Sequence, residues 1–183
     1  MNHIVFDLEA TCWESESEAS GKRREIIEIG AVMINDDGKI LSRFESFVKP
    51  ILHPTLSEFC KRLTSISQID INQADEFVEV IEDFKDWIGF YDHEEYILCS
   101  WGFYDKSALK KDCILHDLDN EWVNAHISLK DQYPRIKNTG RAVGLKKAVE
   151  SEGFDFEGTA HRALTDAENT AKIFIKYLNL WRF

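Results

Sequence analysis

Two acidic side chains alternate at the end of the first apolar segment, where Asp7 and Glu9 stand in FDLEAT. Residues two apart on a β-strand face the same side of a sheet, so both carboxylates point the same way. The residues before them are apolar enough for a core strand, and two like charges there are costly without a cation between them. A D-x-E pair also occurs at solvated strand ends, so it indicates a metal site only together with further ligands.

Two further aspartates and a histidine stand beside expected helices. Asp105 begins a helical segment after the apolar run EYILCS, where the helix macrodipole alone also favours an acid. Asp166 lies at the entry to the last helix, on or beside the face that should pack on a sheet. Thr165 and Glu168 have the spacing of a capping box there, and His161 taken alone is compatible with an ordinary loop histidine.

These acids from distant parts of the chain form one site if the elements that carry them meet at one end of a sheet. Hard oxygen ligands of this kind suit Mg²⁺ or Mn²⁺. Two such ions about 4 Å apart clamp the attacking and leaving oxygens of a phosphoryl displacement. A neutral imidazole beside them is suited to take a proton from the attacking water. The residue types therefore indicate hydrolysis of a phosphodiester.

Hydrophobic periodicity predicts the elements that must position these residues. Strands are expected over residues 2–8, 25–35, 39–48, 95–100 and 122–127. Helices are expected over residues 56–63, 66–71, 75–88, 105–115, 144–152 and 163–180, and a mobile loop over 14–24. This order, an opening β-meander followed by βαβ units, predicts an α/β protein. We expect a ribonuclease-H-like, mixed five-stranded sheet flanked by helices on both faces.

Composition limits the class of protein. A length of 183 residues predicts a single domain over residues 1–183, and 44% hydrophobic with 30% charged residues is ordinary globular composition. No apolar run approaches the ~18 residues that span a bilayer, and the start lacks the features of a secretory signal. The four scattered cysteines are expected to be buried thiols of a cytoplasmic protein. A net charge of −11 argues against a free-standing DNA-coating protein but not against a nuclease.

Three motifs resemble, in order, those of the DEDDh family of 3′–5′ exonucleases, the histidine-containing branch of the DnaQ-like superfamily. They are FDLEATC, SWGFYDKSALKKDC and HRALTDAENTA, the last with the H-x4-D spacing. The resemblance runs from residue 4 to about residue 178. EATC with its polar insert, IIEIGAV, FVKP and LSEFCKRLTSISQIDINQA are most similar to the Eri-1/3′hExo-type and KapD-like exonucleases.

The resemblance implies a role for each matching residue. The ligands of two divalent ions, Mg²⁺ or Mn²⁺, would be Asp7, Glu9, Asp105 and Asp166, and the general base would be His161. The residues that contact the 3′-terminal nucleotide would be Ala10, Thr11, Leu63, Thr64, Ile66, Trp101 and Phe103.

The resemblance also implies how each of these residues would contact the nucleotide. The small Ala10 would let the nucleotide approach, and the hydroxyl or amide of Thr11 would bond its sugar. The L-T-S-I segment would wedge against the last base, with Ser65 where the family has glycine. For Trp101 and Phe103, stacking on a base and packing in the core are equally favoured.

The implied activity is removal of 5′-mononucleotides from single-stranded nucleic acid with a free 3′ end, RNA being preferred and DNA possible. A phosphate track is expected from Lys130, Arg135, Lys137, Arg141, Lys146 and Lys147, extended by Lys22, Arg23 and Arg24 if their loop folds over the cleft. Three alternatives stay open: a DNA proofreading or repair exonuclease, a regulatory protein-binding module on an exonuclease scaffold, and a metal-stabilised domain without turnover. No membrane contact is expected, and no protein partner is predicted.

Overall fold

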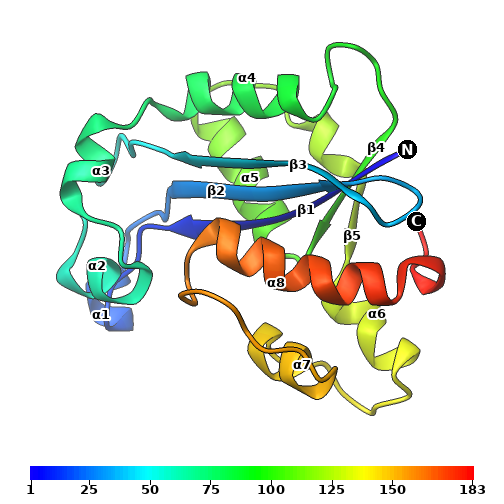
Figure 1. Cartoon of the computed structure of the whole chain (residues 1–183). Coiled ribbons are helices and arrows are strands. Elements are labelled where there is room, and N and C mark those ends of the chain that lie inside the picture. Colours follow the sequence, from blue (N-terminus) through cyan, green and yellow to red (C-terminus); the bar gives the residue numbers. More distant parts are fainter.

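A mixed five-stranded sheet lies between two layers of helices in the computed structural model, which describes residues 1–183 (Figure 1). The strands, in sheet order β3-β2-β1-β4-β5, are β1 Asn2–Ala10, β2 Ile26–Ile34, β3 Ile40–Phe47, β4 Tyr96–Ser100 and β5 His126–Ser128. The first three strands form an antiparallel meander, whereas β4 runs parallel to β1 and β5 parallel to β4. The predicted α/β architecture is confirmed.

Helices cover both faces of this sheet. One face is covered by α4 (Phe77–Trp87) and α5 (Tyr104–Leu115), the other by α6 (Leu129–Ile136), α7 (Leu145–Ser151) and α8 (Ala163–Lys176). Three short helices lie on the side toward which β1 points: α1 (Glu16–Ala19), α2 (Glu58–Thr64) and α3 (Gln68–Gln73) (Figure 1). Two 3₁₀ turns are η1 (Glu121–Asn124) and η2 (Leu178–Leu180). No helix has both the length and the apolar character needed to cross a membrane.

The segment expected as the last strand, residues 122–127, is mostly a 3₁₀ turn followed by the three-residue β5. Trp122 and Val123 are buried, and the indole N–H of Trp122 donates to the carbonyl of Asp119. Their apolar side chains therefore reach the core from a turn, and an apolar run alone does not distinguish this from a strand.

Two other expectations also need correction. The 14–24 stretch, expected as a loop, contains α1, whose first turn is capped by the hydroxyl of Ser15. The last helix ends at Lys176, and the chain continues through η2 to Trp181, which stacks on Phe174. Helix α6 was not expected because its sequence is polar and contains Pro134.

Side chains of β1 alternate between the two hydrophobic cores. Ile4 and Phe6 pack with α4 and α5, whereas Val5 packs with α8. Asp7 and Glu9 continue the series of Val5, so both lie on the α8 face at the end of the strand. The chain thus presents two carboxylates beside the start of α8.

Strand β2 and helix α8 approach each other most closely at Gly30. A Cβ at this position would overlap the backbone of Ala163 and Leu164, in the first turn of α8. We expect the Gly30→Ala substitution to displace that turn and to lower stability by about 3 kcal/mol or more, because the clash is with backbone. Thermal unfolding should show a melting temperature roughly 6 to 12 °C lower.

The matched control is Gly140→Ala, since a Cβ at Gly140 meets nothing within 4 Å. It should unfold within about 2 °C of the unmodified chain. Equal melting temperatures for the two variants would contradict the close packing of β2 on α8.

Candidate active site

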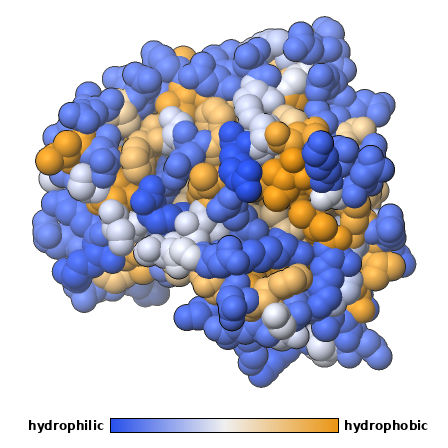
Figure 2. Space-filling view, viewed as in Figure 1, coloured by the Kyte–Doolittle hydropathy of each residue, from blue (hydrophilic) through white to orange (hydrophobic).

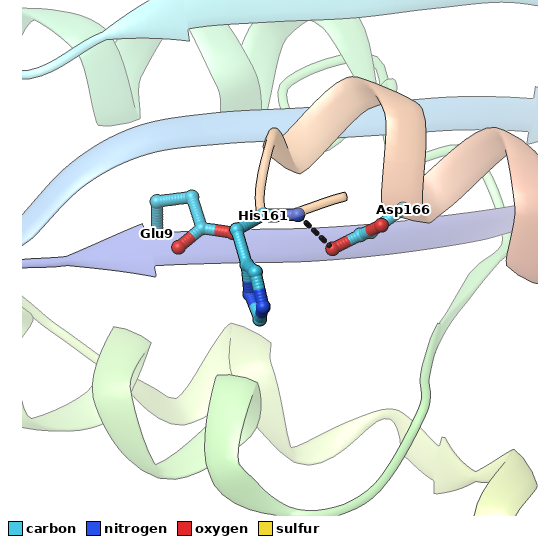
Figure 3. A group of neighbouring side chains, drawn as sticks. All are labelled: Glu9, His161 and Asp166. Carbon is cyan, nitrogen blue, oxygen red and sulfur yellow. Dashed lines mark hydrogen bonds between the residues drawn. The ribbon is translucent and has the colours of Figure 1, made fainter. Parts of the chain in front are cut away.

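Four carboxylates converge at the end of β1. Asp7 and Glu9 come from the strand itself, Asp105 from the first turn of α5 and Asp166 from the first turn of α8. Ligand atoms of Glu9, His161 and Asp166 all lie within 4.8 Å of one another. Figure 3 shows these three residues projecting from β1, from the loop before α8 and from α8. The structure therefore brings together the five residues to which the resemblance gives catalytic roles.

The carboxylates raise one another's pKa values. Burial raises the pKa of Asp7 well above its ordinary value, and the charges of Asp105 and Asp166 raise it further. Burial, followed by the charge of Asp166, raises the pKa of Glu9 to about 8. Burial also raises the pKa of Asp105 to about 7 and raises that of Asp166. Such a cluster is destabilising unless cations or protons offset its charge.

The donor set fits divalent cations. Oδ2 of Asp166 accepts the backbone N–H of His161 at 3.1 Å, but its Oδ1 is buried without any hydrogen-bond donor. A buried carboxylate oxygen without a donor, among other carboxylates, is a suitable ligand for a cation. All four acids offer hard oxygen ligands, which suit Mg²⁺ or Mn²⁺.

This electrostatic arrangement predicts how the stability of metal-free protein depends on pH. The carboxyl of Glu9 has an ordinary pKa of 4.5 and a folded-state pKa of about 8. Between those values the folded chain holds a proton that the unfolded chain has released, so stability falls as pH rises. We expect the melting temperature in EDTA to fall from about pH 5 to pH 8. Saturating Mg²⁺ or Mn²⁺ should reduce the fall by offsetting the carboxylate charges.

Calorimetry or fluorescence melting across that pH range, with and without the cation, checks this expectation. Glu9→Gln provides the comparison, because the amide removes one of the titrating groups and should flatten the profile in EDTA. A metal-free melting temperature that rises toward pH 8 would contradict the proposed repulsion.

His161 lies in the loop that leads into α8. Its φ is +64°, a left-handed conformation that is uncommon for a non-glycine residue, and its side chain is exposed. The bond from its N–H to Asp166 holds this conformation. The loop therefore places the imidazole beside the carboxylates and leaves it open to solvent.

A buried acid in β2 fixes that loop. Glu28 has no exposed surface and lies opposite Glu9 in the β1–β2 pair. Its carboxylate accepts the guanidinium N–H groups of Arg162, at 2.8 and 3.0 Å, and the N–H of Ala163 at 2.9 Å. Glu28 thus caps α8 from another element and anchors the residue between His161 and the helix.

Sequence reasoning did not identify Glu28 or Arg162 as functional residues. The signal for Glu28 was present, because it is the one acid inside the apolar run IIEIGAVMI of β2. An acid at that position must be paired when the strand is buried on both faces. Its partner lies 134 residues away, which periodicity does not reveal.

The residues predicted to contact the nucleotide lie in different environments. Ala10 follows Glu9 at the end of β1. Thr11 makes two hydrogen bonds to the backbone of Glu25: its N–H donates to the Glu25 carbonyl, and its hydroxyl accepts the Glu25 N–H. Thr64 and Ile66 are buried, and Leu63 is the one apolar residue of the wedge that keeps accessible surface. Of the three residues of this segment that are predicted to contact the nucleotide, only Leu63 is accessible for that contact, and the other two pack beneath it.

The backbone of the wedge turns sharply at Ser65. This residue ends α2 with φ +60°, in the left-handed region. Glycine reaches that region without strain, which explains why the family has glycine at the position that this chain fills with serine.

Trp101 and Phe103, the two aromatic residues that could stack on a base, differ in exposure. The indole N–H of Trp101 donates to the carbonyl of Val143, and its ring packs against Tyr133 in the core beneath α6 and α7. Phe103, immediately before α5, is 58% exposed. Of the pair, only Phe103 presents an open face for stacking on a base.

The basic residues expected to form a phosphate track also differ in their surroundings. Lys146 and Lys147 border a cleft of about 480 Å³ together with His161 and Asp166. Lys137 is instead paired with Glu152 at 3.0 Å. The space-filling view shows a mostly hydrophilic face that is indented beside the part formed by α7 (Figure 2).

Comparison with known proteins agrees with this site. A family model described as exonuclease matches residues 4–174. ERI1 exoribonuclease 2 of Xenopus laevis is 30% identical over 199 residues, which cover 93% of this chain and 27% of the relative. 3′-5′ exoribonuclease 1 of Homo sapiens is 30% identical over 184 residues, which cover 95% of this chain and 51% of the relative. The chain thus spans about a quarter to a half of the length of these relatives.

A solved structure of the nuclease domain of 3′hExo, a DEDDh family member bound to rAMP, is similar with a TM-score of 0.89 at 29% identity. The match covers 97% of this chain and 92% of that one, and it confirms the expected ribonuclease-H-like fold. A structure of a 3′-exonuclease in 3′-end-specific recognition of a histone mRNA stem-loop also has a TM-score of 0.89, at 28% identity, covering 97% of this chain and 81% of that one. With its motifs, its fold and these relatives in agreement, the chain belongs to the exonuclease family, as its resemblance to the DEDDh members predicted.

Proposed function

We propose that this chain is a metal-dependent 3′–5′ exonuclease that hydrolyses the terminal phosphodiester of single-stranded RNA. The observation that carries the proposal is the group of four carboxylates and His161 at the end of β1, in which a buried oxygen of Asp166 has no donor. The whole chain, residues 1–183, would act as one catalytic domain.

Asp7, Glu9, Asp105 and Asp166 would hold two divalent cations, Mg²⁺ or Mn²⁺. When bound, such ions supply Lewis-acid stabilisation of the attacking and leaving oxygens. His161, exposed beside the carboxylates, takes a proton from the attacking water. The water oxygen bonds to phosphorus, the bond from phosphorus to the 3′ oxygen of the preceding nucleotide breaks, and that oxygen is protonated. The products are a 5′-mononucleotide and a strand one nucleotide shorter.

Two sets of comparisons support RNA as the substrate. Both named relatives are exoribonucleases, and the two similar structures hold rAMP or recognise an mRNA stem-loop. An unpaired 3′ end suits the site because its bases can be splayed and stacked on exposed side chains such as Phe103. DNA shares the scissile bond and stays a possible substrate until the two sugars are compared.

We also place the protein in the cytoplasm. All four cysteines are buried and none is in a disulfide, which is the usual state in a reducing compartment.

The test is a nuclease assay on 5′-labelled single-stranded RNA and DNA of identical sequence, in Mg²⁺, Mn²⁺ and EDTA. The expected result is a metal-dependent ladder that shortens from the 3′ end and is faster on RNA. Equal or faster cleavage of mismatched DNA ends would favour a repair exonuclease. Absence of cleavage in folded protein that binds metal would overturn the proposal in favour of a binding module.

A further inference from the structure

A second cleft opens next to the carboxylates, on the side opposite α8. It has a volume of about 510 Å³ and lies between the segment that leads into β2 and one face of α5. One end is formed by Ala10, which follows Glu9, and by Tyr104, which precedes Asp105. From there the cleft follows α5 as far as Lys111 and Ile114. This end of the cleft therefore lies beside the two segments that carry Glu9 and Asp105.

Cations from two distant segments line this cleft. They are Lys22, Arg23, Arg24 and Lys111. None of the four forms an ion pair within 4 Å. Arg23 donates from Nη2 to the carbonyl of Lys111, which joins the two walls, and its Nε is buried without a partner.

The two acids in the cleft offset the four cations only in part, and both also hold backbone groups. The carboxylate of Glu25 is buried and accepts three backbone N–H groups, from Ile51, Leu52 and His53. The carboxylate of Asp112 is buried and accepts the N–H of Ile26 at 2.7 Å. In a chain with a net charge of −11, four cations against two acids make this cleft a local excess of positive charge.

Exposed apolar surface accompanies the cations. Tyr104 is 49% exposed and Ile114 is 60% exposed, and Phe103 beside them is 58% exposed. Cations interleaved with exposed aromatic rings are the composition that binds single-stranded nucleic acid, the rings stacking on bases and the cations on phosphates. The cleft bordered by Lys146 and Lys147 has two cations and also contains Glu150.

We propose that this α5 cleft binds the part of the RNA strand that lies 5′ of the scissile bond. The inference rests on the proposed function. Tyr104 and Lys111 are seven residues apart on α5, which corresponds to roughly 10 Å, or about three stacked nucleotides. An exonuclease has only one nucleotide on the 3′ side of the bond it cuts. A contact three nucleotides away therefore belongs to the upstream strand, and it should affect long substrates and leave the shortest ones unaffected.

The test variant is Lys22→Glu/Lys111→Glu, because both side chains are exposed and neither forms an ion pair; the ammonium of Lys22 lies over the Trp13 ring, 4.8 Å from its centre. Its matched control is Lys39→Glu/Arg182→Glu, which changes the charge equally through two exposed, unpaired cations near the opposite end of the sheet. The neutral pair Lys22→Gln/Lys111→Gln separates loss of attraction from added repulsion. Melting curves confirm that each variant is folded.

Steady-state rates on a dinucleotide and on a 20-nucleotide RNA supply the first readout. We expect the test variant to raise KM for the long RNA roughly tenfold with kcat nearly unchanged, and to leave dinucleotide hydrolysis unaffected. The slope of log affinity against log salt for the long RNA should fall by about 1.4, because two phosphate contacts are lost. An unchanged KM for the long RNA, or an equal rise in the control, would overturn the inference.

Binding of fluorescent RNA in EDTA supplies a readout that does not need turnover. If the unmodified chain binds RNA but does not cut it, the proposed function fails, and weaker binding by the test variant alone would still support the cleft. If the unmodified chain cuts RNA and both variants bind it equally well, the function stands and the cleft proposal falls.

Discussion

Replacing Asp7 with asparagine is expected to lower mononucleotide release at least ~10³-fold and, at the same time, to stabilise the metal-free protein. Asp7 lies at the centre of the four carboxylates, and their charges together with burial raise its pKa well above the ordinary value. An amide has nearly the same shape and no charge, so it removes repulsion from Asp105, Asp166 and Glu9. It is also a much poorer ligand for a divalent cation.

Three measurements on one preparation check this prediction. The melting temperature of Asp7→Asn in EDTA near pH 8 should exceed that of the unmodified chain by about 3 °C or more, which corresponds to about 1 kcal/mol. Its rise in melting temperature on adding Mn²⁺ should be reduced, and its nuclease ladder should disappear. A variant that is inactive but also less stable in EDTA would mean that Asp7 supports the fold and not the cation site.

Asp92→Asn is a suitable control. Asp92 is exposed on the loop before β4 and makes no side-chain hydrogen bond or ion pair. The same chemical change there should alter neither the response to metal nor the rate. A loss of activity in both variants would point to a general effect of net charge.

The carboxylate site was predictable because the position of each acid follows from the strand or helix that carries it. Alternation along a strand places Asp7 and Glu9 on one face, and each of the other two acids stands in the first turn of a helix. The βαβ order of the chain packs these elements around one sheet. The end of the strand and the first turns of the two helices then lie together, and so do the acids that they carry. The His161-to-Asp166 spacing belongs to a single loop and turn, so it is also visible in the sequence.

What holds that site in place was not predictable, because it depends on contacts between distant residues. Thr165 and Glu168 have the spacing of a capping box, but α8 begins earlier and its first N–H is bound by Glu28 of β2. Glu168 instead pairs with Arg43 on β3. The local spacing therefore predicted the helix correctly, but it predicted a cap from Thr165 and Glu168 where the structure has one from Glu28.

Burial separated other residues that sequence reasoning treated alike. Trp101 and Phe103 are two residues apart, yet one is packed under α6 and the other is open to solvent. Ile66 and Leu63 belong to the same wedge, yet Ile66 packs into a core with Ile27 and Cys60. Which face of a short segment is covered depends on the neighbouring elements, and these are not determined by periodicity within the segment.

Replacing His161 with asparagine is expected to lower the rate by roughly 10² to 10⁴-fold while leaving the binding of metal intact. Asparagine is chosen because it tolerates the left-handed conformation that His161 adopts, at φ +64°. The N–H bond to Asp166 therefore survives, and the loop stays in place. The variant lacks only the imidazole that, under the proposed function, would take the proton from water.

The pH dependence of the rate distinguishes a base from a structural residue. A general base must be unprotonated to accept the proton, so removing the base should weaken the dependence of the rate on acid pH. His161→Asn should show a much weaker acid limb on its residual activity. If the acid limb persists unchanged, another group takes the proton.

Comparison with Asp7→Asn then distinguishes a base from a ligand. Nδ1 or Nε2 of His161 lies within 4.8 Å of carboxylate oxygens of Glu9 and Asp166, close enough for the imidazole itself to coordinate a cation. If it acts as the base, Asp7→Asn shows a reduced metal-induced rise in melting temperature and loses turnover, whereas His161→Asn loses turnover alone. If both variants show a reduced rise, His161 is a ligand of the cation, and the imidazole is not the group that takes the proton of the attacking water.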